Sequence, residues 1–176
     1  NNKAPGWDSI TAEHIKYGGQ TLAHALTYLF NAMVAIIHIP KHQKVGVIVP
    51  IPKGEKDATI QSNNRGITLL PVVGKIFEKI LFERHITWSN DKDPLDPLQG
   101  AAQDKCSSLH TTLLLRETIA YNLERNSSVY VAMLDTQKAF DTVWVNGLLY
   151  TLHQSGMDPV LWRLLLELYT GFTCHI

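Results

Sequence analysis

The chain has 176 residues, with 16 Lys and Arg against 16 Asp and Glu, and 45% of its residues are hydrophobic. This composition excludes intrinsic disorder as the default, and the length fits one domain or part of one. The formal charge of zero excludes recognition of polyanions through a global positive field, so any phosphate binding has to come from individually placed residues.

The first strongly periodic stretch runs from residue 22 to residue 37, where apolar residues recur at helical spacing until Pro40. Its most apolar part, residues 25–39, is shorter than the about 20 residues that a membrane-spanning helix needs. The two cysteines, Cys106 and Cys174, have no metal-site spacing and suggest no disulfide framework. We therefore expect an intracellular protein that is neither secreted nor membrane-bound.

A β-hairpin is predicted next. Residues 45–51 are rich in β-branched side chains, and Pro50 and Pro52 exclude a helix and suit a strand at a sheet edge. Residues 53–57 are typical of a hairpin tip, and residues 67–70 resemble the returning strand.

The remainder of the chain is predicted to be mostly helical. We expect helices from Gly74, from Ser107 or Ser108 to Leu123, from Asn146 to Gln154 and from Asp158 toward Gly171, with a loop over residues 91–97. Residues 129–134 carry apolar side chains on both alternating faces, which is typical of a buried central strand. The last residues, 173–176, resemble the beginning of a strand. The fold class is therefore α+β or α/β and helix-rich.

Asp135 is the first candidate for chemistry, because it directly follows the predicted central strand. A carboxylate at the end of a buried strand is costly to desolvate unless a cation, donor or metal faces it. A hard cation such as Mg²⁺ takes one or two protein carboxylates and otherwise keeps waters and substrate phosphates. The alternative is that Asp135 only caps the turn after the strand.

Lys53 and Arg65 lie on either side of the predicted hairpin tip, which could present both cations to one face. Such a pair could clamp a triphosphate and neutralise charge on a phosphoryl group during transfer. The alternative is that both side chains are simply solvated. Phe140, taken alone, is typical of a core aromatic.

Three segments in order resemble the motifs of reverse transcriptases from non-LTR, LINE-type retrotransposons. They are Val49-Pro50-Ile51-Pro52-Lys53, Asn63-Asn64-Arg65-Gly66-Ile67-Thr68-Leu69-Leu70 and Leu134-Asp135-Thr136-Gln137-Lys138-Ala139-Phe140-Asp141-Thr142-Val143-Trp144. The segments Lys3-Ala4-Pro5-Gly6-Trp7-Asp8 and Lys75-Ile76-Phe77-Glu78-Lys79-Ile80-Leu81 resemble further family elements. The resemblance spans almost the whole chain.

The resemblance implies a right-hand polymerase fold of class α+β. Residues 1–128 would form the fingers and early palm, and residues 129–176 would continue the palm. Asp135 would be a catalytic aspartate that binds Mg²⁺ in a two-metal site, with the backbone of Thr136 also directed toward metal. Two such ions, about 3.5–4 Å apart, stabilise the attacking and leaving oxygens of an in-line displacement.

The resemblance also assigns the nucleotide-binding residues. Lys53 and Arg65 would grip the incoming triphosphate, and Phe140 would be the steric gate that clashes with a ribose 2′-OH. Asp141 is typical of the family and suggests a structural hydrogen bond. The implied function is RNA-directed DNA polymerisation, with an RNA template, a DNA primer and dNTPs as partners.

The sequence also departs from the family. Asn64 stands where the family commonly has an aromatic residue before the arginine, and residues 101–106 replace an aromatic and a basic turn with a mixed set. No aromatic-x-Asp-Asp sequence follows Asp135. We therefore expect a fragment cut at both ends, without the rest of the palm, the thumb and the endonuclease, and catalytically inactive alone.

Three other interpretations stay open on sequence grounds. The chain could be an inactive remnant with at most weak nucleotide or nucleic-acid binding, which the neutral charge and the missing motifs favour. It could be a phosphatase or phosphotransferase with Asp135 as nucleophile. Such enzymes often carry a second aspartate two positions on, where this chain has Gln137. It could also be a binding or structural domain without catalysis.

Overall fold

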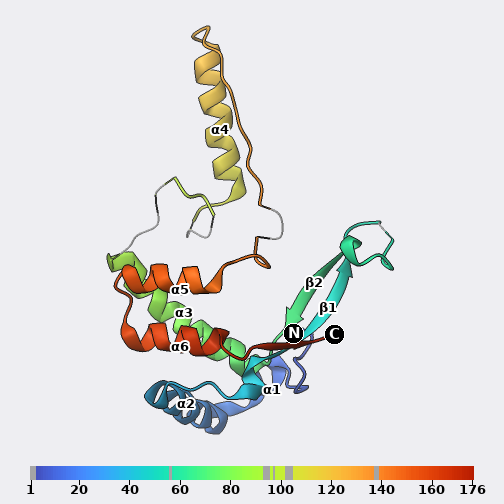
Figure 1. Cartoon of the computed structure of the whole chain (residues 1–176), viewed down its shortest axis with the longest axis vertical. Helices are drawn as coiled ribbons and strands as arrows, with labels where there is room; N and C mark the ends of the chain where they lie inside the picture. Colours follow the sequence, from blue (N-terminus) through green and yellow to red (C-terminus); the bar gives the residue numbers. More distant parts are fainter. Residues whose placement is uncertain (1–2, 56, 93–95, 97, 102–104, 137–138) are drawn as a thin grey trace. The chain divides into compact units, whose positions relative to one another are not determined.

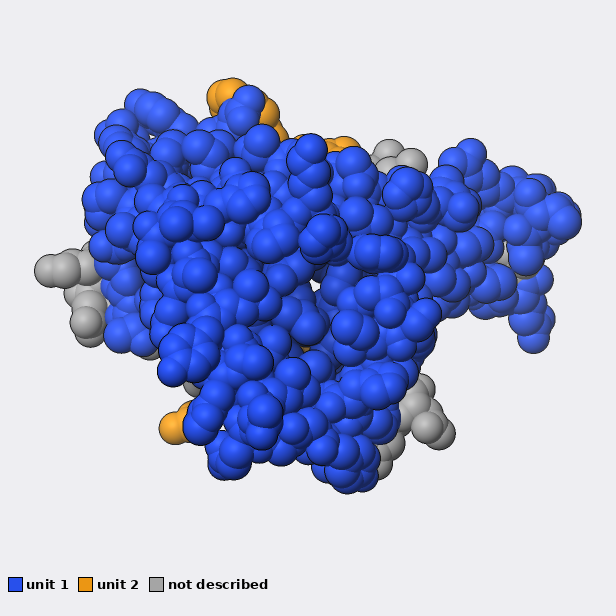
Figure 2. Space-filling model, turned by 90° about the horizontal axis from the view of Figure 1, so that it is seen from below, with its two compact units in different colours: residues 1–88, 145–176 blue, residues 89–144 orange. Residues whose placement is uncertain are grey.

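The computed structural model describes residues 3–55, 57–92, 96, 98–101, 105–136 and 139–176. These residues form six α-helices, two short 3-10 helices and three strands, so the prediction of a helix-rich chain with both α and β structure is confirmed (Figure 1). The chain divides into two compact units. Unit 1 comprises residues 1–88 and 145–176, which form one continuous body in Figure 2, and unit 2 comprises residues 89–144.

The sheet of unit 1 has the strand order β2-β1-β3. Strand β1 (Val45–Pro52) pairs antiparallel with β2 (Asn64–Leu69) and parallel with β3 (Thr173–His175). The predicted hairpin is therefore confirmed, and so is a strand near residue 173. Within the hairpin, Ile51 lies opposite Arg65.

Five of the α-helices start in unit 1: α1 (Ala12–Tyr17), α2 (Gly19–Ile36), α3 (Val72–Lys92), α5 (Val145–Gln154) and α6 (Pro159–Tyr169). The 3-10 helices are η1 (Lys41–Lys44) and η2 (Gln61–Asn63). Helix α1 was not predicted. Helix α5 begins one residue before Asn146, so the predicted cap at that residue is wrong. The predicted start of α6 is confirmed, because the Asp158 carboxylate accepts hydrogen bonds from the backbone N–H groups of Val160 and Leu161.

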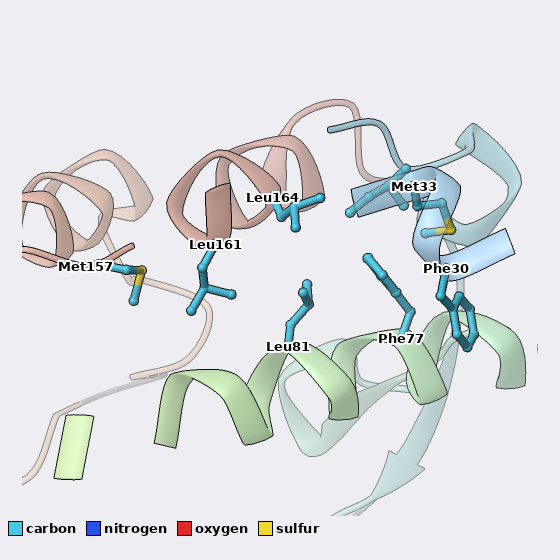
Figure 3. Packing of buried hydrophobic residues seen from close by; sticks show 8 residues of the cluster. Phe30, Met33, Phe77, Leu81, Met157, Leu161 and Leu164 are labelled. Carbon is cyan, nitrogen blue, oxygen red and sulfur yellow. The ribbon is translucent and has the colours of Figure 1, made fainter. Parts of the chain in front are cut away.

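The core of unit 1 lies where α2, α3 and α6 meet (Figure 3). The rings of Phe30 on α2 and Phe77 on α3 have their centroids 5.3 Å apart. Leu164 on α6 is fully buried, and Leu81 on α3 is almost so. Residues from both chain segments of unit 1 therefore fill one core.

An ion-pair cluster also joins the two segments. Lys44, at the end of η1, is buried, and its ammonium nitrogen lies 3.0 Å from Oε1 of Glu167 on α6. The same nitrogen donates to the backbone oxygen of Glu167 at 3.2 Å. Nδ1 of His38 lies 3.2 Å from the same carboxylate oxygen, and the Ile39 N–H donates to it at 3.5 Å. This cluster fixes the residues just before β1 against α6.

Unit 2 contains one long helix, α4 (Ser108–Leu123), at the place predicted. Ser107 occupies the N-cap position without a side-chain capping bond to the backbone, and its hydroxyl lies 3.1 Å from Nδ1 of His110. No residue of α4 is buried. In the predicted loop at 91–97, helix α3 extends to Lys92, and residues 93–95 and 97 lie outside the described part of the chain.

The predicted buried central strand at residues 129–134 is wrong. The structure assigns no strand to this segment, and Tyr130, Met133 and Leu134 are 94%, 91% and 99% exposed. A strand needs a hydrogen-bonding neighbour, and the described residues of unit 2 contain no other strand that could supply one. The apolar side chains of this segment therefore remain exposed in unit 2, although their pattern is typical of a buried strand.

Among the described residues, no helix is both long enough and apolar enough to cross a membrane.

Candidate functional site

The β1–β2 hairpin carries two of the predicted site residues and extends away from the helices of unit 1 (Figure 1). Residue 52 lies opposite residue 64, and the Lys53 N–H donates to the Asn63 carbonyl at 2.8 Å, so the antiparallel register continues for one residue beyond β1. Pro50 and Pro52 fit this strand. Proline has no N–H group to donate to a neighbouring strand, so it is tolerated at strand ends and where the strand lies at the edge of the sheet.

From the hairpin register we expect Lys53 and Arg65 to lie on the same face. Side chains alternate along a strand, and residues directly opposite each other in an antiparallel pair share a face. Because Arg65 lies opposite Ile51, it shares a face with Ile51 and therefore with Lys53 two residues on. Diagonal neighbours of this kind lie about 7–8 Å apart, within reach of long side chains. The predicted pairing of the two cations on one face is consistent with this register.

The same face also carries exposed apolar side chains. Val49, Ile51 and Ile67 share it with the two cations and are 38%, 45% and 40% exposed. Chemically, the face combines an apolar surface with two positive charges at one end. Such a surface suits a ligand with an apolar or aromatic part and an anionic part.

The loop between the strands is held by side-chain hydrogen bonds. The Asp57 carboxylate accepts hydrogen bonds from the Thr59 hydroxyl at 2.7 Å and from the Thr59 N–H at 2.9 Å. Both bonds hold the pKa of Asp57 below its ordinary value of 3.8, and the bond from the hydroxyl has the larger effect. The amide of Asn63 donates to the Asp57 carbonyl at 3.0 Å. Gly54 has a φ of +65°, which favours glycine at the start of the loop.

Two features of the hairpin were not predicted. The ammonium of Lys53 donates to the Ser62 carbonyl at 3.0 Å, so it is bound to the loop itself. The amide of Asn64 donates to the carbonyls of Ala58 and Ile60, so the position that departs from the family organises this loop. The sequence feature that could have indicated the role of Asn64 is the preference of Asn for side-chain-to-backbone hydrogen bonds in turns.

The other predicted site residues belong to unit 2. Asp135 and Thr136 are exposed and lie in a segment without regular structure, so Asp135 does not end a buried strand as predicted. Phe140 is 98% exposed in a turn over residues 139–142, so it is not a core aromatic in this structure. Residues 137 and 138 of the same predicted motif lie outside the described residues. The predicted site residues therefore divide between the two units. Unit 1 contains Lys53 and Arg65, and unit 2 contains Asp135, Thr136 and Phe140.

The side chains available as metal ligands show whether the predicted Mg²⁺ could be held. Within the ranges that the structure describes, no three His, Cys, Asp or Glu side chains gather as they would around a metal ion. An exposed aspartate still fits Mg²⁺, which takes one or two protein carboxylates and fills its other positions with water and phosphate oxygens. Asp135 can thus supply one ligand of such a site.

Unit 1 also has an open groove of about 710 Å³, lined by Leu70, Lys75, Glu78, Lys79, Phe82, Leu168, Tyr169 and Phe172. Burial raises the pKa of Glu78 above its ordinary value of 4.5, and the nearby charge of Lys75 opposes this effect. The ammonium of Lys79 forms an ion pair with Glu83 and lies 4.9 Å from the ring centroid of Phe82. The groove therefore has an apolar lining with largely compensated charge.

No family model matches the chain. Curated relatives do. The probable RNA-directed DNA polymerase from transposon X-element of Drosophila melanogaster is 30% identical over 162 residues, which is 90% of this chain and 18% of the relative. The RNA-directed DNA polymerase from mobile element jockey of the same species is 31% identical over 84% of this chain, and that of Drosophila funebris is 26% identical over 96%. Over most of its length the chain is therefore similar to RNA-directed DNA polymerases of Drosophila transposons and mobile elements, which supports a fragment of a reverse transcriptase domain.

The chain spans 16–18% of the length of these three relatives. The three alignments cover 84–96% of this chain. The family predicted from the three motifs is therefore confirmed. The mixed α and β structure with a small sheet is compatible with this family.

Proposed function

We propose that this chain is the fingers and the first part of the palm of an RNA-directed DNA polymerase. In this proposal residues 1–128 form the fingers and early palm, and residues 129–176 continue the palm. The observation that carries the proposal is the hairpin register, in which Arg65 pairs with Ile51 two residues before Lys53, in a chain similar to RNA-directed DNA polymerases. The substrates would be dNTPs, an RNA template and a DNA primer.

In the proposed mechanism, the hairpin face binds the nucleotide. Lys53 and Arg65 pair with the oxygens of the triphosphate, and Arg65 can do so through two parallel hydrogen bonds. The Lys53 ammonium has three N–H donors, so it can donate to the Ser62 carbonyl and to the triphosphate at the same time. The two charges then offset the charge that develops on the transferred phosphoryl group.

Asp135 is proposed to hold Mg²⁺ together with the Thr136 backbone carbonyl. When bound, the metal stabilises charge on the oxygens of the reacting phosphoryl group. Phe140 is proposed to select deoxyribonucleotides, since an aromatic ring beneath the sugar excludes a 2′-hydroxyl. These assignments rest on the resemblance of residues 134–144 to the family motif and on the exposure of these side chains.

The test is binding of dTTP with Mg²⁺ to the chain, followed by primer extension on an RNA template with a longer product that also contains the rest of the palm. We expect Lys53→Ala and Arg65→Ala each to weaken dTTP binding about tenfold, the factor for one lost charge-assisted hydrogen bond of about 1.4 kcal/mol. Lys16→Ala and Arg84→Ala, exposed cations on helices of the same unit, are the matched controls.

Asp135→Asn tests the metal ligand, and Phe140→Ala tests the steric gate. Asp135→Asn should abolish extension, and Phe140→Ala should raise incorporation of ribonucleotides relative to deoxyribonucleotides. Equal dTTP affinity in the hairpin variants and their controls would contradict the nucleotide-binding proposal. Full extension activity of Asp135→Asn would contradict the role of Asp135.

A further inference from the structure

The loop at the end of the hairpin is organised by one side chain in particular. The Asn64 amide nitrogen donates to the Ala58 carbonyl at 2.7 Å and to the Ile60 carbonyl at 3.0 Å. Asn64 itself is half-buried, although it lies on an exposed hairpin. One NH₂ group thus ties the start of β2 to two points of the loop.

The same loop holds Lys53. The loop leads into η2, whose Ser62 carbonyl accepts the Lys53 ammonium, and the next carbonyl, that of Asn63, accepts the Lys53 N–H. The conformation that Asn64 stabilises therefore determines where these two acceptors lie. Displacement of the loop would release the Lys53 side chain and the last hydrogen bond of the ladder together.

Asn64 acts on Arg65 by a different route. Arg65 is the next residue of β2, so its side chain lies on the opposite face from that of Asn64. The Asn64 side chain consequently does not share the face that carries the two cations. It can affect a ligand on that face only through the backbone that it anchors.

We propose that Asn64 is a positioning residue that orders the hairpin loop so that Lys53 and Arg65 are held ready for a triphosphate. This inference rests on the proposed nucleotide binding by these two cations. The required chemistry is a planar group with two N–H donors on a short side chain, because two carbonyls have to be reached at once. Aspartate has the same shape but presents an acceptor to both carbonyls, and alanine presents nothing.

The experiment measures dTTP affinity with Mg²⁺ by calorimetry and amide hydrogen exchange of residues 54–55 and 57–62 in the same 176-residue chain. The variants are Asn64→Ala and Asn64→Asp, each alone and combined with Lys53→Ala. Asn122→Ala is the matched control, because the Asn122 amide also donates to a backbone carbonyl, that of Thr118, but on α4 of unit 2.

We expect Asn64→Ala to weaken dTTP binding about tenfold and to remove exchange protection only in the loop, as for hydrogen bonds of ordinary net strength. Asn64→Asp should weaken binding at least as much. When Lys53 is already alanine, the Asn64 substitutions should have a clearly smaller effect, because a double-mutant cycle reveals residues that act through one another. The control should leave affinity unchanged.

Three results would overturn the inference. If the unsubstituted chain does not bind dTTP, both the proposed function and this inference fail. If it binds dTTP and Lys53→Ala weakens binding, but both Asn64 variants bind like the unsubstituted chain, only the inference fails. If the effects of Asn64→Ala and Lys53→Ala simply add, Asn64 does not act through Lys53.

Discussion

Replacement of Glu167 by Gln should destabilise unit 1, because it leaves the buried Lys44 ammonium without its carboxylate. Lys44 is 5% exposed and Glu167 is 24% exposed. Removal of one partner of a buried ion pair costs about 3–5 kcal/mol. Glu167 is partly solvated, and glutamine keeps an oxygen acceptor of similar shape, so we expect a loss of about 2 kcal/mol, below that range.

The effect of Glu167→Gln should depend on pH. The hydrogen bond from Lys44 is the largest cause that lowers the pKa of Glu167 below its ordinary value of 4.5, and the N–H of Ile39 and the charges of Lys44 and His38 add to it. A carboxyl whose pKa is lower in the folded state stabilises the fold above its unfolded pKa, and this stabilisation is lost as pH falls through the folded pKa. The difference between the two proteins should therefore be largest near neutral pH and shrink below about pH 4.

The free energy of unfolding can be measured by urea titration with tryptophan fluorescence. A Trp144→Phe background removes the tryptophan of unit 2 and leaves Trp7, Trp88 and Trp162 in unit 1. Glu83→Gln is the control, because Glu83 pairs with Lys79 on the solvent-exposed face of α3. The two side chains are 61% and 65% exposed, so this variant should lose less than about 0.5 kcal/mol. Equal losses for Glu167→Gln and Glu83→Gln would refute the assignment of the Lys44 cluster as a stabilising element.

Three further predictions concern the core, the groove and unit 2. Leu164→Ala, at a fully buried position, should lower the free energy of unfolding by about 2–5 kcal/mol in the same titration, whereas Leu148→Ala, 38% exposed, should lose less than about 1 kcal/mol; similar losses would contradict the core assignment. Glu78→Gln should stabilise unit 1 at pH 7 but not near pH 4. Burial raises the pKa of Glu78, so the folded state loses stability as pH rises and this carboxyl ionises, and glutamine carries no such charge; urea titrations at both pH values test this. Limited chymotrypsin digestion followed by mass spectrometry should cut within residues 127–136, which have no regular structure and are mostly exposed, before the buried Phe77. First cleavage at Phe77 would contradict its burial in the core.

The elements that the sequence predicted correctly are those that local chemistry determines. Pro50 and Pro52 exclude a helix, and β-branched neighbours favour a strand, so β1 was predictable without knowledge of its partners. Asp158 followed by Pro159 is a local start signal, and α6 begins there. The three ordered motifs likewise identified the family.

The elements that were missed depend on partners distant in the chain. The apolar run at residues 129–134 becomes a strand only if another strand pairs with it, and periodicity does not reveal whether one is present. The buried Lys44 could not be predicted either, because its partner Glu167 lies 123 residues away. Asn64 was noted as a departure from the family, but its two acceptors depend on the conformation of the loop.

The discontinuity of unit 1 has a consequence during protein synthesis. Phe77 and Leu81 leave the ribosome long before Leu161 and Leu164, which cover them in the finished core. At about 5–20 residues per second, the interval between Leu81 and Leu164 lasts roughly 4–17 s. Throughout that interval α2 and α3 present an uncovered apolar surface while unit 2 is being made. The nascent chain is thus a substrate for chaperones at a predictable stage, and synonymous codons between residues 82 and 164 would lengthen or shorten that stage.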